Sequence, residues 1–241
     1  MIKPEKVDVV VLCGGLGTRL RAVVSDRPKS LAEISGKPFL DLLINYVSMF
    51  GFRRFILCVG YKGEMVLDYY KKQVDKKRQI LISREEKPLG TAGAIKNAER
   101  FLRSDPFLVI NGDSLCSVDL KNFLKFHEEN KAVLSIILTS AIHGDDCGKI
   151  ILDKKTKEIT NFAEKRKITN KGLTNMGIYL FSKDLLREIP KKKKVSLEND
   201  FFPKLIGRGL FGKVVTKDFI DIGTPERFRM FKDAQENVLI K

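Results

Sequence analysis

Glycine and basic residues gather near the N-terminus of the 241-residue chain in a pattern suited to binding phosphates. The stretch Gly14-Gly15-Leu16-Gly17-Thr18-Arg19 follows directly after an apolar run. Its glycines let backbone N–H groups approach a polyphosphate without obstruction by side chains. Arg19 adds a guanidinium group whose fork geometry matches phosphate oxygens. We therefore predict that this loop cradles a polyphosphate.

Two well-known phosphate-binding loops differ from this stretch in detail. A dinucleotide-binding fingerprint needs a third glycine at the position of Leu20, and a Walker A loop needs Gly-Lys followed by Ser or Thr, which the stretch lacks. The remaining alternative is a glycine-rich turn without a ligand.

A second cluster of candidate residues follows in Asp26-Arg27-Pro28-Lys29-Ser30-Leu31. Pro28 stiffens the backbone just before Lys29 and so favours one direction for the ammonium group. Catalysis of phosphoryl-type transfer is mostly positioning and neutralisation of the charge that builds on the phosphorus oxygens. Arg19 and Lys29 are therefore the predicted catalytic residues.

Alternating strands and helices must position these loops. The apolar run 7–13 stops at Gly14 and predicts a buried parallel strand, and apolar residues at helical spacing predict a helix over 39–50. Further strands are predicted at 55–59, 80–83 and 107–110, with helices at 64–72 and 94–102 between them. This alternation predicts a Rossmann-like three-layer α/β/α fold with a mixed, mostly parallel central sheet.

The second half of the chain has fewer helices between its apolar stretches. We predict a helix at 119–130, strands at 132–139, 148–152 and 173–181, and a last helix that opens at Thr224-Pro225-Glu226. No repeat or linker divides the sequence, so residues 1–241 are expected to form a single domain with lobes over about 1–112 and 113–241. Ligands of open α/β sheets bind beyond the carboxyl ends of the strands, where Gly14 and Asp113 stand.

Composition and charge narrow the class of partner. An apolar content of 43% supports one substantial core, and the net charge of +15 favours anionic partners. Lysine runs such as 191–194 lack interleaved aromatic residues. Small anionic substrates or a solvated surface therefore explain the charge better than nucleic acid, which we do not expect as a partner.

Cysteine usage and hydropathy indicate the compartment. Cys13, Cys58, Cys116 and Cys147 form no C-x-x-C pair and are predicted to be small buried thiols in a reducing environment. No apolar run approaches the roughly 20 residues of a membrane span, and the charged N-terminus is unlike a secretory signal. We expect a cytoplasmic protein without a membrane partner.

The two N-terminal loops together resemble the signature of the sugar nucleotidyltransferases, also called nucleotide-sugar pyrophosphorylases. Residues 14–20 followed by Arg27-Pro28-Lys29 carry this resemblance, which extends over most of the chain. The stretches 26–40 and 89–93 are most similar to guanylyltransferases, in particular those that use D-glycero-α-D-manno-heptose 1-phosphate. The resemblance implies an enzyme that joins GTP to a sugar 1-phosphate and releases pyrophosphate, with a nucleotide-binding first lobe and a sugar-phosphate-binding second lobe.

The resemblance also implies a magnesium cofactor. Asp113, in Asn111-Gly112-Asp113, and Asp221, in Ile220-Asp221-Ile222-Gly223, are similar to the family's two metal carboxylates. Mg²⁺ is usually held by one or two carboxylates together with phosphate oxygens and water. The structural alternative is that Asp113 closes a turn after its strand and that Asp221 only precedes a helix cap.

Further residues are expected to contact the substrates. The nucleotide-binding residues are expected to be Leu12, Gly14, Gly15, Gly17, Thr18, Glu85, Gly90 and Thr91. The sugar-phosphate-binding residues are expected to be Gly112, Glu164, Lys165, Asn175 and Gly177. Glu85 is the expected partner of the guanine donors, with Glu86 as the alternative, because the register of a loop cannot be read from sequence. The structural alternative is that both are solvated charges on an exposed loop. Leu197-Glu198-Asn199-Asp200 is interpreted as a helix start after Ser196.

Other functions stay open at this stage. A mannose-1-phosphate guanylyltransferase, or a thymidylyl-, cytidylyl- or uridylyltransferase of another hexose 1-phosphate, would share these motifs. A nucleotide-sugar-binding module without turnover should have lost Lys29 or a metal carboxylate, and Lys29, Asp113 and Asp221 are all present. The oligomeric state is open, a homodimer included.

Overall fold

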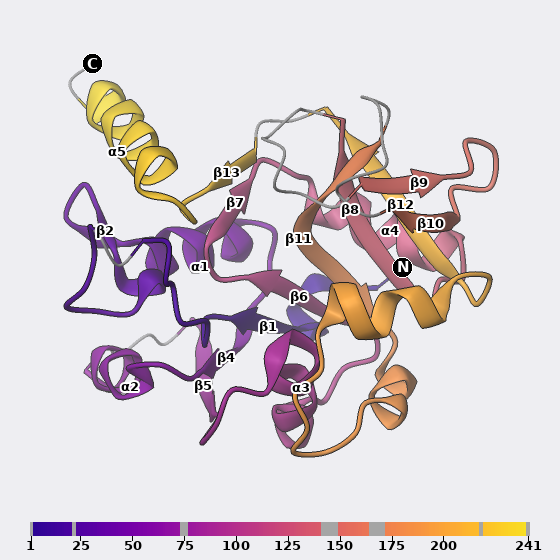
Figure 1. Ribbon diagram of the computed structural model, residues 1–241, viewed down its shortest axis with the longest axis horizontal. Helices are drawn as coiled ribbons and strands as arrows, with labels where there is room; N and C mark the ends of the chain where they lie inside the picture. Colours follow the sequence, from indigo (N-terminus) through magenta and orange to yellow (C-terminus); the bar gives the residue numbers. More distant parts are fainter. Residues whose placement is uncertain are drawn as a thin grey trace.

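A nine-stranded sheet forms the centre of the computed structural model, which describes residues 2–20, 23–72, 77–140, 149–163, 172–216 and 219–239 (Figure 1). The main path of the sheet runs β10-β9-β11-β6-β1-β4-β5, with β8 beside β11 and β12 beside β8. The strands are β1 (Asp8–Leu12), β4 (Arg54–Val59), β5 (Gln79–Arg84), β6 (Phe107–Asn111), β8 (Leu134–Thr139), β9 (Lys149–Leu152), β10 (Ile159–Ala163), β11 (Leu173–Phe181) and β12 (Leu210–Val215).

Most strands of this sheet point in one direction. β5, β4, β1 and β6 are parallel neighbours, and so are β8 and β12. β11 is antiparallel to β6, β8 and β9, and β10 is antiparallel to β9. Within the described sheet, only β10 and β11 therefore run against the rest. The predicted mixed, mostly parallel sheet is confirmed.

Helices cover both faces of the sheet (Figure 1). One face packs against α1 (Phe39–Met49), α2 (Gly63–Lys71) and α4 (Leu120–Glu129), and the other against α3 (Gly90–Asn97) and the helical turns between 183 and 205. In β1 the side chains of Val9 and Val11 pack in the apolar cluster under α1, α2 and α4, whereas Val10 packs in the cluster under α3. Successive residues of a strand face opposite sides, so a fully apolar strand needs a cover on both faces. The predicted three-layer α/β/α fold is confirmed.

Two helix starts follow the predicted capping chemistry. Ser196 Oγ accepts a hydrogen bond from Asn199 N at 3.2 Å, and Ser196 N donates to Asp200 Oδ2 at 2.7 Å. This reciprocal pair satisfies backbone donors that the first turn leaves unpaired. The turn it opens, Leu197–Phe201, is π-helical. Thr224 Oγ1 likewise accepts from Arg227 N at 3.3 Å where α5 (Pro225–Leu239) begins.

Several short strands lie outside the sequence prediction. β7 (Ser114–Cys116) pairs antiparallel with β13 (Phe219–Asp221), and β2 (Glu33–Ile34) pairs with β3 (Lys37–Pro38). Strands of two or three residues are too short to show a periodic pattern. β10 and β12 were also not predicted, because polar residues or a glycine interrupt their apolar runs.

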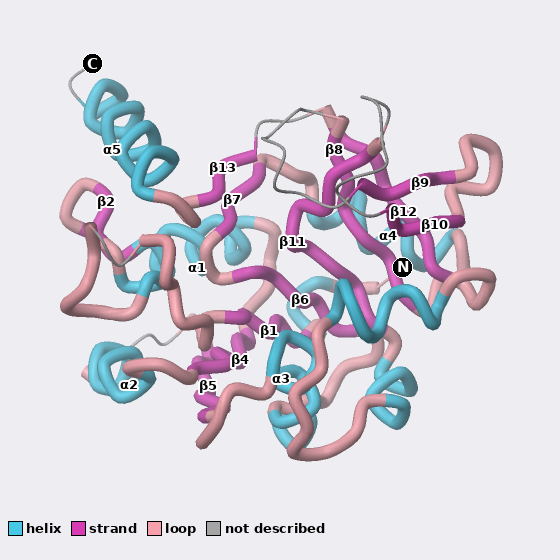
Figure 2. The backbone as a smooth tube through the Cα atoms, viewed as in Figure 1, coloured by secondary structure: helices cyan, strands magenta, loops and turns pink. Residues whose placement is uncertain are grey.

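The C-terminal helix packs on the segment that follows the glycine loop. α5 lies at the edge of the molecule (Figure 2), and its Phe228 and Phe231 join a separate apolar cluster with Leu20 and Phe39. The rings of Phe39 and Phe231 meet edge to face with centroids 6.0 Å apart. One apolar cluster therefore joins the end of the glycine loop, α1 and the C-terminal helix.

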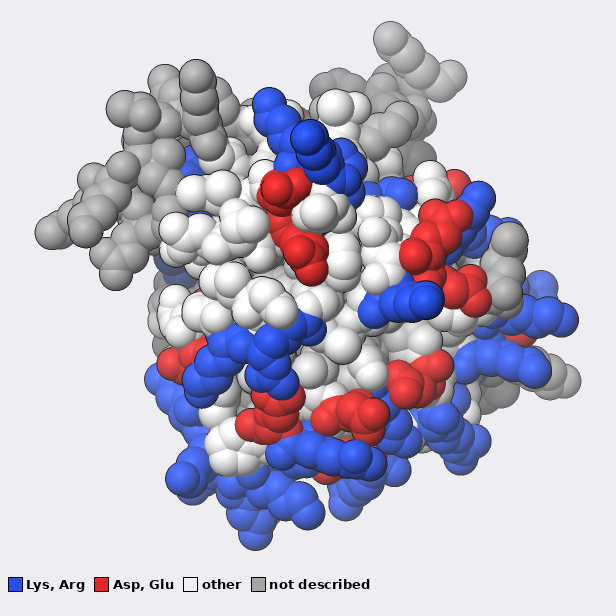
Figure 3. Space-filling view, turned by 90° about the vertical axis from the view of Figure 1, so that its right-hand side faces the viewer, with Lys and Arg blue, Asp and Glu red and all other residues white. Residues whose placement is uncertain are grey.

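Charges of both signs occupy the surface. On the face shown in Figure 3, Asp and Glu side chains lie between the more numerous Lys and Arg side chains. This face is therefore one of mixed charge and not an unbroken basic surface. Among the described helices, none is long and apolar enough to cross a membrane.

A buried ion pair fixes the amino end of the parallel strands. Asp8 and Arg54 pair with side chains 3% and 13% exposed. Asp8 Oδ2 also accepts from Arg103 N at 2.5 Å and Ser104 N at 3.0 Å, and Arg54 Nη2 donates to Phe101 O at 2.7 Å. These bonds tie β1 and β4 to the segment that enters β6.

Asp8→Asn is expected to lower the free energy of unfolding by about 3 kcal/mol, because it leaves Arg54 as a buried charge without its counter-ion. Urea unfolding followed by circular dichroism measures the change. Glu188→Gln is the control, since Glu188 pairs with Arg208 at the surface and exposed pairs contribute little. Equal losses in the two variants would contradict a stabilising role of the Asp8–Arg54 pair.

Candidate active site

The carboxyl ends of β1 and β6 bring the glycine loop next to Asp113. The two strands are parallel neighbours with Leu12 opposite Asn111, and Gly112 N donates to Leu12 O at 2.9 Å. A Cβ at position 112 would lie 2.9 Å from Leu12 O and 3.0 Å from the Cβ of Cys13. A residue with a side chain would therefore push the two loops apart.

A cavity of about 200 Å³ opens at this edge of the sheet. It is lined by Leu12, Cys13, Gly15, Gly17, Thr18, Arg19, Lys29, Ser30, Gly112, Asp113 and Gly223. Gly17 has a φ of +59°, a conformation that favours glycine. The lining brings together most residues of the glycine loop, both predicted catalytic cations and one predicted metal carboxylate.

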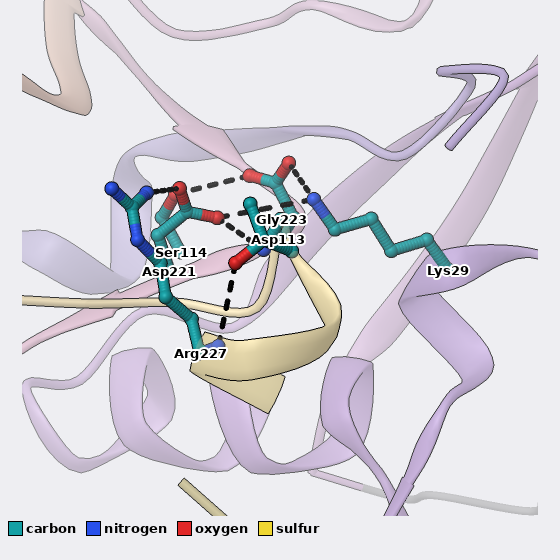
Figure 4. Close-up of polar contacts among 7 residues, drawn as sticks. Lys29, Asp113, Ser114, Asp221, Gly223 and Arg227 are labelled. Atoms are coloured by element: carbon teal, nitrogen blue, oxygen red, sulfur yellow. Dashed lines mark hydrogen bonds and ion pairs between the residues drawn. The ribbon is translucent and has the colours of Figure 1, made fainter. Parts of the chain in front are cut away.

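Lys29 contacts both predicted metal carboxylates (Figure 4). Its Nζ lies 2.7 Å from Asp113 Oδ2 and 3.9 Å from Asp221 Oδ1, and its side chain is 14% exposed. Pro28, with a φ of −66°, directly precedes the 3₁₀ turn Lys29–Leu31 and restricts the direction in which Lys29 leaves the loop. Two carboxylates from distant parts of the sequence thus converge on one cation.

The ladder between β7 and β13 brings these carboxylates together. Asp221 lies opposite Ser114 in the antiparallel register, and Ile222 N donates to Asp113 O at 3.0 Å. The segment around Asp221 is therefore hydrogen-bonded directly to the backbone of Asp113. Adjacent residues of facing strands are close enough for their side chains to share a ligand.

Neighbouring groups hold each carboxylate in place. Ser114 Oγ donates to Asp113 Oδ1 at 3.0 Å. Gly223 N donates to Asp221 Oδ1 at 2.5 Å, and Arg227 Nη1 donates to Asp221 Oδ2 at 2.8 Å. The sequence prediction did not include Ser114, Gly223 or Arg227. Proximity to the predicted aspartates is a signal for the first two, whereas no motif marks Arg227.

The paired aspartates fit a magnesium ion. Both carboxylates face one cation, the ammonium group of Lys29, and carboxylate oxygens are the ligand type that Mg²⁺ prefers. Among the described residues there is no group of three or more His, Cys, Asp or Glu side chains that could hold a metal. A pair of carboxylates suits an ion whose coordination is completed by phosphate oxygens and water.

Cys13 lines the cavity but is unsuited to nucleophilic chemistry. Burial, with a smaller contribution from the charge of Asp113, raises the pKa of its thiol to about 12. Since the thiolate is the reactive form of cysteine, a thiol with this pKa stays protonated and inert at neutral pH. Cys58 and Cys116 are buried free thiols, and Cys147 lies outside the described residues.

Glu85 lies beside the glycine loop. Its Oε2 accepts a hydrogen bond from Leu89 N at 3.1 Å. Its Oε1 lies 3.1 Å from the position that a Cβ on Gly14 would take, and closer still to the position of a Cβ on Gly60. Partial burial raises the pKa of Glu85, whereas the neighbouring Glu86 is exposed. Of the two alternatives, Glu85 is therefore the carboxylate that lies against the loop.

Gly90 and Thr91 contact the segment before the π-helical turn. Gly90 has a φ of +70°, and a Cβ there would lie 2.5 Å from Val195 O. Thr91 Oγ1 accepts from Leu197 N at 2.7 Å. These contacts join α3 to residues 195–197, a structural role that the sequence did not suggest. Their predicted contact with a nucleotide stays a prediction.

Asn175 and Gly177 lie on β11 next to β6. Gly177 has a φ of +73°, and a Cβ there would lie 2.5 Å from the side-chain nitrogen Nδ2 of Asn111. Asn175 Nδ2 donates to Glu198 Oε1 at 2.8 Å and to the hydroxyl of Tyr179 at 2.9 Å. Glu198 is therefore hydrogen-bonded to Asn175, a predicted sugar-phosphate-binding residue. Glu164 and Lys165, the other predicted sugar-phosphate residues, lie outside the described residues.

Comparison with known proteins identifies the family. The nucleotidyl transferase family matches residues 8–237. The chain belongs to this family. It is 34% identical over 228 residues to the D-glycero-alpha-D-manno-heptose 1-phosphate guanylyltransferase of Campylobacter jejuni, a match that covers 93% of this chain and 98% of the relative. It is also 34% identical over 227 residues to the mannose-1-phosphate guanylyltransferase of Mycobacterium tuberculosis, of which it covers 63%.

Solved structures show the same fold. HddC from Yersinia pseudotuberculosis, in a crystal structure of its complex with GMP-PN, matches with a TM-score of 0.82 and 35% identity over 95% of this chain and 99% of that chain. A UDP-glucose pyrophosphorylase complexed with UDP-glucose matches with a TM-score of 0.82 over 96% of this chain and 98% of that chain. At 18% identity that second match supports the fold alone. The predicted family and its enzymatic class, nucleotidyl transfer, are confirmed.

Gly223→Ala is expected to lower turnover about ten-fold or more. A Cβ at this position would lie 2.6 Å from Asp221 Oδ1 and 3.1 Å from Lys29 Nζ, so the carboxylate and the ammonium must shift. Misplacement of reacting groups by about 1 Å can cost on the order of 100-fold in rate. Pyrophosphate release measures turnover, and the Tm shows whether the fold is intact. Wild-type turnover in a folded variant would contradict a requirement for close packing at Gly223.

Proposed function

We propose that this chain is a magnesium-dependent guanylyltransferase that joins GTP to D-glycero-α-D-manno-heptose 1-phosphate and releases pyrophosphate. The product is the GDP-sugar. The observation that carries the proposal is that the glycine loop, Lys29 and Asp113 line one cavity, with Asp221 facing Lys29. Phosphate cradle, cation and metal carboxylates are the groups that nucleotidyl transfer requires.

The proposed reaction is a single displacement at the α-phosphorus of GTP. An oxygen of the sugar 1-phosphate attacks, the bond from the α-phosphorus to the bridging oxygen breaks, and pyrophosphate leaves with that oxygen. No general base is needed, because the attacking phosphate oxygen is already anionic at neutral pH. The protonated Cys13 thiol offers no competing nucleophile.

The chain's own residues bind and neutralise the phosphates. Backbone N–H groups of Gly14, Gly15 and Gly17 would cradle the triphosphate, and Arg19 and Lys29 would take up the charge that develops on its oxygens. Mg²⁺ bound to Asp113 and Asp221 would supply further neutralisation of the α-phosphate and fix its orientation. In this proposal the nucleotide occupies the lobe up to residue 112, and the sugar phosphate occupies the lobe from 113 onward.

The sugar-phosphate side of the proposal uses residues from the second lobe. Asn175 and Gly177 lie on β11, and Gly177 lies beside Asn111, two residues before Asp113. Glu164 is proposed to bind ring hydroxyls, and Lys165 is proposed to orient the attacking phosphate. A cation near that phosphate would also reduce its repulsion from the triphosphate.

The choice of heptose 1-phosphate as the sugar substrate follows the similarity of this chain to two heptose 1-phosphate guanylyltransferases. The heptose 1-phosphate guanylyltransferase of Aneurinibacillus thermoaerophilus is 35% identical over 224 residues, which cover 92% of this chain and 96% of the relative. The mannose-1-phosphate guanylyltransferase of Mycobacterium tuberculosis has a similar identity of 34% over 227 residues. Mannose and the manno-heptose share their ring hydroxyl pattern and differ in the exocyclic tail, so mannose 1-phosphate is the natural competitor.

A pyrophosphate-release screen tests the proposal. GTP, dTTP, CTP, UTP and ATP are each paired with the heptose 1-phosphate, mannose 1-phosphate and glucose 1-phosphate. The highest kcat/KM is expected for GTP with the heptose 1-phosphate, and chelation of Mg²⁺ should abolish it. A higher kcat/KM with mannose 1-phosphate would overturn the choice of sugar, and a higher value with another base would overturn the choice of nucleotide.

Glu85 is proposed to select guanine. Guanine presents two adjacent donors, N1–H and the N2 amino group, and one carboxylate can accept from both. Thymine presents one donor between two carbonyl oxygens, which a carboxylate would repel. Glu85 lies against Gly14 and is held by Leu89 N, so its carboxylate is oriented beside the proposed nucleotide loop.

Glu85→Gln is expected to lower the ratio of kcat/KM for GTP to that for dTTP by about ten-fold or more. The glutamine offers one acceptor oxygen in place of two, so one of the two guanine donors would be left without a hydrogen-bond partner. Glu86→Gln is the matched control on the next residue, whose side chain is exposed, and should leave the ratio unchanged. If neither variant changes the ratio, base choice is made elsewhere.

A further inference from the structure

Arg227 contacts the oxygen of Asp221 that faces away from Lys29. Its Nη1 lies 2.8 Å from Asp221 Oδ2, while Oδ1 accepts from Gly223 N at 2.5 Å and faces Lys29 at 3.9 Å (Figure 4). The two oxygens therefore have different partners on opposite sides. Rotation of the carboxylate would break the bond to Arg227 or the bond to Gly223, so the pair fixes its orientation.

The helix that carries Arg227 is itself anchored beside the cavity. Thr224 accepts from Arg227 N through its side chain at 3.3 Å and from Phe228 N through its carbonyl at 3.0 Å. Phe228 is 7% exposed and packs in the apolar cluster that contains Leu20, the residue after Arg19. The backbone of Arg227 is therefore held by a capped helix start and a hydrophobic contact.

Charge favours the same arrangement. Lys29 faces both Asp113 and Asp221, and Arg227 pairs with Asp221. Each carboxylate therefore faces a cation, and Asp221 faces two. The side chains of Asp221 and Arg227 are 19% and 28% exposed, so solvent screens their contact only in part. A guanidinium group has a planar array of donors and holds a carboxylate more directionally than the ammonium group of a lysine.

We propose that Arg227 is a positioning residue for metal binding. It orients Asp221 so that Oδ1 stays directed toward the side on which Asp113 lies, where the two carboxylates would bind the metal ion together. Partners that orient metal-binding carboxylates in this way typically contribute 10- to 100-fold in metal affinity or activity. The consequence for turnover rests on the proposed function. The consequence for metal affinity does not depend on which nucleotide or sugar the enzyme uses.

The test compares Arg227→Met, Arg227→Lys and Arg229→Met in the full chain. Arg229 lies on the same helix, is exposed and undergoes the same chemical change, so it is the matched control. Electron paramagnetic resonance of Mn²⁺ without nucleotide gives the Kd of the ion, and a thermal melt without metal gives the Tm. Pyrophosphate release at saturating Mg²⁺ gives kcat and the KM for GTP.

Arg227→Met is expected to raise the Kd for Mn²⁺ about ten-fold and to lower kcat by a similar factor, with a Tm equal to that of Arg229→Met. Arg227→Lys should recover part of both losses, and Arg229→Met should match the wild type. A Kd for Mn²⁺ unchanged in Arg227→Met overturns the proposal. Loss of Mn²⁺ binding with a lower Tm and no recovery in Arg227→Lys also overturns it, because the residue then serves only the helix. If Mn²⁺ binding depends on Arg227 but the wild type does not turn over GTP, the proposed function is refuted and this inference stands.

Discussion

The parallel pairing of β1 and β6 is the constraint on which the site depends. Parallel neighbours end at the same edge of a sheet, and the bond from Gly112 N to Leu12 O brings the glycine loop and Asp113 together at that edge. The ladder of β7 and β13 then adds Asp221 to the same place. Phosphate cradle and carboxylates therefore meet because of strand topology, although they lie far apart along the chain.

Close approach and charge balance follow from this convergence. Gly112, Gly177 and Gly223 each stand where a Cβ would lie under 3.0 Å from a backbone or side-chain atom of the site. Two carboxylates in one place repel each other, and the ammonium group of Lys29 between them relieves that repulsion. The same lysine is proposed to bind the triphosphate. Its single positive charge would therefore face both the aspartates and the substrate.

The sequence alone determined the layers of the fold and the loops that carry the chemistry. Buried strands such as 7–13 are continuous apolar runs because both faces of a parallel sheet are covered. The helices could be predicted from the helical spacing of their apolar residues. Glycine, proline and capping residues mark turns through local backbone preferences, which is why the start of α5 at Thr224 was predictable. The family resemblance rested on the same local motifs and is confirmed by the match over residues 8–237.

Only the tertiary structure decided which side chains meet across the chain. The strands β7 and β13 are too short to carry a pattern, and the pairing of Asp221 with Ser114 is a register between distant segments. Arg227 reads in the sequence as one charged residue of a surface helix, and its bond to Asp221 depends on where α5 packs. The choice between Glu85 and Glu86 as the carboxylate against the glycine loop likewise required the loop register, because adjacent residues have the same chemistry and differ only in the direction that the folded backbone gives them.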